Sequence, residues 1–205
     1  MAKKRIDVPR KTRDDVMREF HHRCAICGIH DPQLHHIDED PTNNVPENLL
    51  PLCPNCHHLD HHDPTSPVDP RKLQLFRRYK DPLILSPQFE PLFGRFEFLL
   101  DLDEADFDKK VAREQADELV QFVSELEMGS FYGKKMKRLV KEPISMPGFM
   151  SLDTPDDVLR RWAEEGRKKY FNQLTVAVEQ VLELAVELLR YQPWTWTPKV
   201  NSQGR

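Results

Sequence analysis

The longest regular pattern in the chain lies near its C-terminal end, where apolar residues recur at alternating spacings of three and four. This spacing places them on one face of a helix. We expect that helix over residues 154–191, because Thr154-Pro155-Asp156-Asp157 combines a capping threonine, a proline at the first position and two acids. It is interpreted as the core helix of a bundle, with a dimer or partner interface as the alternative. The apolar positions are Phe171, Leu174, Val178, Val181, Ala185 and Leu188, widened by Leu182, Val186 and Leu189.

Three shorter patterns predict further helices, over residues 12–22, 71–79 and 104–128. In the first, Asp14 and Asp15 follow Thr12, which is typical of a helix start. The third helix is expected to bury one apolar side, formed by Phe107, Val111, Leu119, Phe122, Val123 and Leu126.

The segment between the first two of these helices is broken into short pieces. Residues 34–37 and 49–52 are predicted strands, and the intervening DEDPTNNVPEN is rich in turn-forming residues. A short helix is expected over residues 55–62, since Asp63-Pro64 would stop it. The order is therefore two strands, a loop and a helix.

A domain boundary is predicted in the DPTSPVDP segment, residues 63–70, which holds three prolines and almost nothing to bury. It separates a small mixed domain, residues 1–66, from a mainly α-helical domain, residues 67–205. The expected fold class is α+β.

The chain has 205 residues and a formal net charge of -4, which disfavours a protein that coats nucleic acid by bulk electrostatics. A local basic surface remains compatible with this charge. The most basic segment follows Phe131 and Tyr132, and it predicts either a contact with a nucleic-acid backbone or a solvated helix face. Its cations are Lys134, Lys135, Lys137, Arg138 and Lys141.

All four cysteines and all nine histidines lie between His21 and His62. The cysteines form two CxxC pairs, and four thiolates close a tetrahedral zinc site. We therefore predict a structural Zn2+ held by Cys24, Cys27, Cys53 and Cys56. Because this pattern suits zinc better than disulfides, a reducing compartment and a cytoplasmic location are expected. No apolar run approaches the roughly 18 residues of a membrane span, so no membrane partner is expected.

The histidines call for a second explanation. His35 and His36 are adjacent, so on a strand they point to opposite faces and only one can readily join a given metal shell. His57 and His61 are four apart and share one face of a helix, and His58 and His62 form the alternative pair. A strand histidine plus a helical pair would give three nitrogen ligands with room for water and substrate.

In this order, CAIC, LHHI, Asn48-Leu49 and LCPNCH resemble the HNH endonucleases in their zinc-stapled form, over residues 12–62. The resemblance implies a small ββα-metal (His-Me finger) module with a four-cysteine zinc knuckle. It implies that His36 is the general base and that Asn48 holds the loop carrying it. The implied ligands of a catalytic divalent metal (Mg2+, Mn2+, Ni2+ or Zn2+) are His35, His57 and His61.

The function implied by this resemblance is hydrolysis of phosphodiester bonds in DNA by a one-metal mechanism, in a phage-defence or mobile-element setting. A neutral imidazole is suited to accept a proton from the attacking water. The alternative is a non-catalytic, zinc-stabilised module that binds nucleic acid or protein. The helical half carries no motif that we recognise, and we expect it to position the substrate, form a homodimer or dock a larger protein partner.

Overall fold

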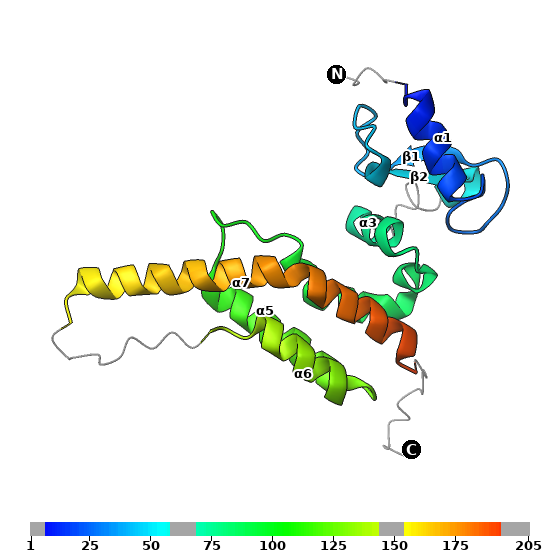
Figure 1. Ribbon diagram of the computed structural model, residues 1–205. Coiled ribbons are helices and arrows are strands. Elements are labelled where there is room, and N and C mark those ends of the chain that lie inside the picture. Colours follow the sequence, from blue (N-terminus) through cyan, green and yellow to red (C-terminus); the bar gives the residue numbers. More distant parts are fainter. Residues whose placement is uncertain (1–6, 58–68, 144–153, 194–205) are drawn as a thin grey trace, which may run out of the picture. The chain divides into compact units, whose positions relative to one another are not determined.

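The computed structural model describes residues 7–57, 69–143 and 154–193, and its contacts divide the chain into two compact units (Figure 1). Unit 1 is Met1–Ser86 and unit 2 is Pro87–Arg205. The fold is a mixture of helix and sheet, as predicted, with a small sheet in unit 1 and a helical unit 2. Among the described residues, no helix combines the length and apolar character needed to cross a membrane.

Unit 1 is built around one antiparallel strand pair, β1 (Gln33–His36) and β2 (Leu49–Leu52), in which Gln33 faces Leu52 and His36 faces Leu49. Strand β2 has the predicted bounds, and β1 begins and ends one residue before the predicted strand over 34–37. Every residue of β2 is buried, whereas on β1 His35 is buried and its neighbour His36 is only half-buried. The predicted opposite orientation of these two histidines is thus consistent with their burial.

The remaining elements of unit 1 flank the sheet. Helix α1 (Arg10–Glu19) ends before the predicted His22, because His21 and His22 adopt left-handed backbone conformations with φ of 54° and 56°. Residues 54–57 are helical directly after β2, and the rest of the predicted helix over 55–62 lies outside the described residues. The ββα-metal module itself therefore stays a prediction. The other elements are η1 (Pro46–Asn48), α3 (Pro70–Tyr79) and η2 (Pro82–Leu85).

Helix α3 belongs to unit 1 because one of its arginines is bonded into the rest of that unit. The guanidinium of Arg77 donates to both carboxylate oxygens of Glu19, at 2.9 and 2.7 Å, and also to the carbonyls of Pro46 and Leu49. It stacks over the Phe20 ring, and the residue is only 8% exposed. The division between the two compact units falls after Ser86, and the predicted domain boundary after residue 66 stays a prediction.

We expect Arg77→Met to destabilise unit 1 by about 2–4 kcal/mol, because it leaves buried carbonyl oxygens without a donor. Arg78→Met is the matched control, since Arg78 is the exposed neighbour on the same helix and should change stability by less than about 0.5 kcal/mol. Hydrogen exchange of peptides from residues 7–57 measures the effect. Equal exchange in the two variants would contradict the role assigned to Arg77.

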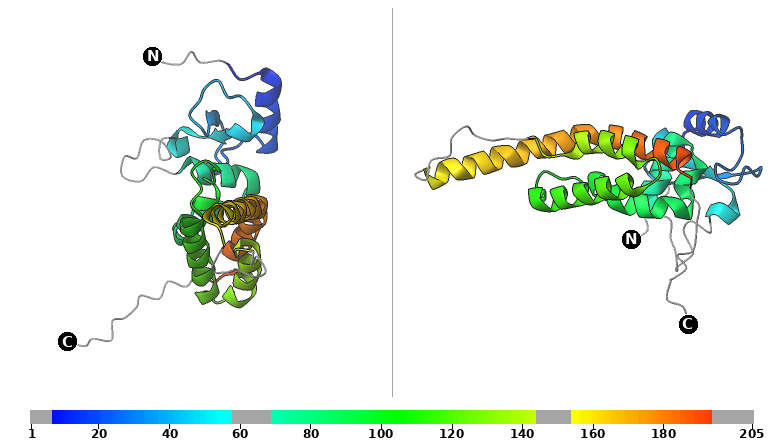
Figure 2. Two further views of the ribbon diagram at one scale, coloured as in Figure 1. Left: turned by 90° about the vertical axis from the view of Figure 1, so that its left-hand side faces the viewer. Right: turned by 90° about the horizontal axis from the view of Figure 1, so that it is seen from below.

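Unit 2 is a helical assembly centred on three helices, α5 (Lys109–Glu125), α6 (Gly129–Val140) and α7 (Asp156–Tyr191). Helix α5 packs against α6, and α6 packs against α7, as Figure 2 shows. A shorter helix, α4 (Glu90–Phe96), lies against α5. It is flanked by two 3-10 turns, η3 (Pro87–Phe89) and η4 (Glu97–Leu99).

Helix α5 begins later than predicted. Its cap is Asp108, whose carboxylate accepts from the backbone N–H groups of Lys110 and Val111, so residues 104–108 are not helical. The prediction that Val111 is buried is wrong, because this side chain is 48% exposed. The buried face instead runs through Ala112, Ala116, Leu119 and Val123.

The long helix α7 is buried along only part of its length. No residue from Asp156 to Lys169 is buried, and this end extends beyond α5 and α6 (Figures 1 and 2). From Tyr170 to Leu189 the helix forms the core, which confirms the predicted bundle helix. A dimer or partner interface on α7 stays a prediction.

Candidate metal centre and the loop beside His36

Four cysteine sulfurs gather at one end of the sheet, where their Sγ atoms all lie within 4.8 Å of one another. The backbone of the first pair is folded into a tight knuckle: Cys24 N–H donates to Ile29 O at 2.8 Å, and Gly28 N–H donates to Cys24 O at 2.9 Å. Gly28 has φ of 74°, which only glycine adopts at low cost. The predicted ligands Cys24, Cys27, Cys53 and Cys56 are thus positioned to hold a metal ion.

The knuckle is joined directly to the second CxxC pair. Ala25 N–H donates to Pro51 O on β2 at 2.8 Å, and β2 leads straight into Cys53. Because the sheet fixes β2, it also fixes the distance between the two pairs. Sequence positions that lie far apart are in this way brought to one point.

The electrostatics of the cluster suit a cation. A hydrogen bond from the backbone N–H of Cys56, at 3.5 Å, lowers the pKa of the Cys53 thiol to about 7. Burial, by contrast, raises the pKa of the Cys56 thiol. A bound cation would reverse the second effect, since it stabilises every thiolate around it. Four sulfur donors in one cluster are a ligand set that structural zinc prefers.

Two of the predicted histidine ligands lie together. The rings of His35 and His57 meet edge to face, with centroids 5.0 Å apart, and His35 is only 6% exposed. The third predicted ligand, His61, lies outside the described residues, as does the alternative pair His58 and His62. Within the part of the chain that the structure describes, the histidines do not complete a set of three ligands.

The predicted base, His36, is held by an amide in the loop that follows β1. Its Nε2 lies 2.9 Å from Oδ1 of Asn44. An amide oxygen only accepts, so a neutral His36 ring that donates from Nε2 in this contact carries its lone pair on Nδ1. A neutral imidazole in this tautomer can accept a proton at Nδ1.

The same loop is braced by Asn48, which is 6% exposed. Its Oδ1 accepts from Asp38 N–H at 3.0 Å, while its Nδ2 donates to Asn43 O at 2.9 Å and Asp38 Oδ1 at 2.8 Å. Burial alone would raise the pKa of Asp38, but hydrogen bonds from Asn43, Asp40 and Asn48 hold it below its usual range. Asn48 therefore fixes both ends of the turn that carries Asn44.

Sequence reasoning missed Asn44 and Asp38, which it treated as ordinary turn residues of the 38–48 segment. The signal available for them was the adjacent pair of asparagines directly after an Asp-rich turn, since such side chains hydrogen-bond readily to nearby loops. The histidines outside the predicted pattern, His21, His22 and His30, are exposed.

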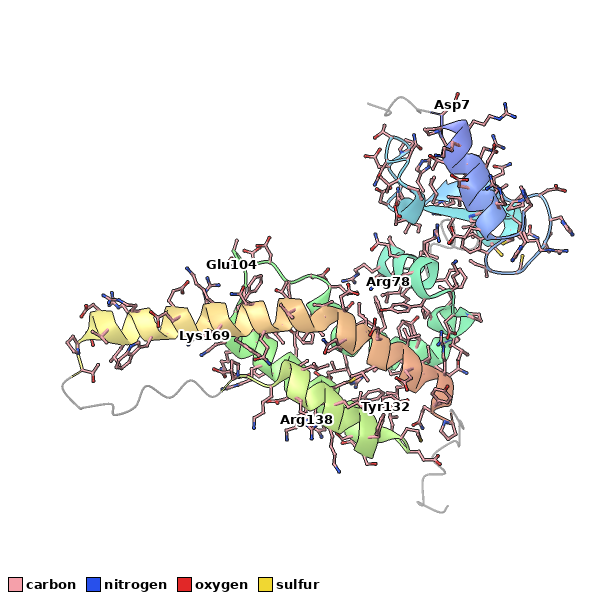
Figure 3. The ribbon with its side chains drawn as sticks, viewed as in Figure 1. Asp7, Arg78, Glu104, Tyr132, Arg138 and Lys169 are labelled. Atoms are coloured by element: carbon pink, nitrogen blue, oxygen red, sulfur yellow. The ribbon has the colours of Figure 1, made fainter. Side chains whose placement is uncertain are left out.

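A groove of about 740 Å³ lies beside the braced loop, with Asp38 and Asn48 in its lining. Three cations on the α3 side, Arg77, Arg78 and Lys80, also line it, and Figure 3 labels Arg78. Lys80 is paired with Glu19 at 2.7 Å. The groove therefore carries charges of both signs.

Comparison of the chain with protein-family models, with curated proteins and with solved structures finds no match. The likeness to HNH endonucleases rests on the four sequence elements described above.

Proposed function

We propose that the protein is a metal-dependent, HNH-type DNA endonuclease in which the four cysteines hold a structural zinc and His36 is the general base. The observation that carries the proposal is the hydrogen bond between His36 and Asn44, which leaves Nδ1 as the ring atom able to accept a proton. His36 is adjacent on β1 to His35, whose ring contacts that of His57.

In this proposal each residue of the site has a separate role. His36 takes the proton from the attacking water at Nδ1, and Asn44 keeps the imidazole oriented while it does so. Asn48 holds the turn that supplies Asn44. A divalent ion held by His35 and either His57 with His61 or His58 with His62 would polarise the phosphate and stabilise the leaving oxygen.

The competing function is a zinc-stabilised module that binds nucleic acid or protein without cutting. One observation favours it: among the residues that the structure describes, the four cysteines form a four-ligand site without a histidine. In that case His35 and His57 would be packing residues of the module.

Supercoiled plasmid and elemental analysis separate the two functions. Purified protein with one zinc per chain is incubated with plasmid and added Mg2+, Mn2+, Ni2+ or Zn2+. We expect nicked or linear products with at least one added ion, ends carrying 5′-phosphate, and a second bound ion per chain. DNA binding without cleavage under all four ions, together with a single ion per chain, would favour the binding module instead.

A further inference from the structure

The exposed face of α6 carries charge of a single sign. Around the helix axis, its buried residues Tyr132, Gly133, Met136 and Val140 occupy one side. The opposite side is exposed and bears Lys134, Lys135, Lys137 and Arg138, with Lys141 directly after the helix end. No acidic residue lies on α6.

The described part of the chain does not neutralise these cations. None of the five forms an ion pair with another residue that the structure describes. The neighbouring helix α5 differs, because its exposed surface mixes Lys110 and Arg113 with acids, and both cations there lie within 4 Å of a glutamate. The face of α6 is therefore unlike an ordinary solvated helix surface, on which the two signs alternate.

The helix dipole explains only part of this arrangement. Lys137 and Arg138 lie in the last turn of α6, where cations stabilise a helix. Lys134 and Lys135 lie a turn earlier, and the dipole gives no reason for them. Lys135 also holds its ammonium 4.2 Å from the centre of the exposed Phe131 ring.

The basic face is held rigidly on α7. The last carbonyls of α6 are bonded by α7 side chains: Tyr170 donates to Val140 O at 2.9 Å, and Gln173 donates to the carbonyls of Leu139 and Lys141 at 2.7 and 2.8 Å. These bonds fix the backbone at the end of α6 and so the positions from which the cationic side chains extend.

A groove of about 660 Å³ continues this face between α6 and α7. Arg138 and Lys141 line it from the α6 side, and Lys169 and Asn172 line it from α7. Figure 3 labels Arg138 and Lys169 on these two helices.

We propose that the exposed face of α6, with the adjoining groove, binds the phosphate backbone of duplex DNA. A helix of twelve residues is roughly 18 Å long, and B-DNA carries about one negative charge per 1.7 Å of its axis, so several phosphates can meet the five cations. The choice of DNA as the polyanion rests on the proposed function. The surface adds affinity and carries no sequence information, because phosphate contacts are alike at every base pair.

The test compares two variants of the 205-residue chain, each of which lacks three positive charges. Lys134→Gln, Lys137→Gln and Arg138→Gln are combined in one variant, and Lys110→Gln, Arg160→Gln and Arg161→Gln in a control. All six side chains are exposed, and glutamine keeps a helix propensity close to those of lysine and arginine. Binding of a fluorescent duplex is measured by anisotropy across a salt series, with Ca2+ in place of the ions that support cleavage.

We expect the α6 variant to bind duplex DNA about tenfold or more weakly, and to lower the slope of log affinity against log salt by about two to three. The control should bind within about twofold of the unaltered protein. The proposal would be overturned if the protein did not bind DNA, or if both variants bound the duplex equally weakly. It would also be overturned if polyglutamate displaced the fluorescent duplex as well as unlabelled duplex does.

Cleavage is recorded separately, so the two proposals fail in different ways. If the unaltered protein cuts no plasmid but the α6 variant still binds more weakly than its control, the proposed catalytic function is wrong and the binding surface stands. If the unaltered protein cuts plasmid and the α6 variant binds like it, the surface is wrong and the nuclease stands.

Discussion

Replacing Cys24 by serine is expected to remove the metal ion and to unfold the N-terminal half of unit 1. The sulfur of Cys24 is one of four within 4.8 Å of one another, and a site of four thiolates loses most of its affinity for zinc with one ligand gone. Structural zinc contributes about 10–16 kcal/mol to the folding of small modules, which is as large as the whole stability of a typical domain, about 5–15 kcal/mol. Loss of the ion should therefore unfold the knuckle rather than loosen it.

The measurement combines metal content with local hydrogen exchange. We expect the ion content to fall from one per chain to none, and the amides of β1 and β2 to lose their protection, while those of α5, α6 and the buried half of α7 keep theirs. Tryptophan fluorescence does not report directly on this change, because residues 7–57 contain no tryptophan.

Ala25→Ser is the matched control, since it introduces the same side chain one residue further along the same turn. Its backbone bond to Pro51 O is retained. A Cys24→Ser protein that keeps both its ion and the protection of β1 and β2 would contradict the structural role of the cluster. So would an unaltered protein that folds without any bound ion.

The parts of the fold that sequence predicted are those set by local patterns. The strands at Leu49–Leu52 and around His35 follow from short apolar segments between turn residues, and the core half of α7 follows from helical spacing. The gathering of four cysteines follows from two CxxC pairs, because few other arrangements satisfy them chemically.

The parts of the fold that the sequence did not predict depend on contacts between distant residues, or on which of several equivalent residues caps a helix. Arg77 looks like one more cation on an amphipathic helix, and only its pairing with Glu19, 58 positions away, makes it buried. Helix α5 could have begun at any of several acids, and its buried face runs through Ala112 while the adjacent Val111 is exposed. The bond between His36 and Asn44 depends on the path of a whole loop, which Asn48 determines.

The largest expected effect on activity is that of His36→Ala, which should lower the cleavage rate by about 10²- to 10⁴-fold, the usual contribution of a positioned general base. The effect should fall on the rate constant and not on DNA binding, because the half-buried ring is proposed to act only on the attacking water. Single-turnover cleavage of plasmid gives the rate, and anisotropy with Ca2+ gives the affinity.

Two further variants distinguish catalysis from a structural contribution. Asn44→Ala removes the carboxamide whose oxygen orients the ring, so we expect a smaller loss, about tenfold, with a changed dependence of the rate on pH. His30→Ala removes an exposed histidine outside the proposed site and should leave the rate unchanged. Equal cleavage by His36→Ala and the unaltered protein would refute the proposed base. If the rate falls and the amides of β1 also lose their protection from hydrogen exchange, His36 stabilises the sheet instead. A base that acts on water has no reason to stabilise the strand that carries it.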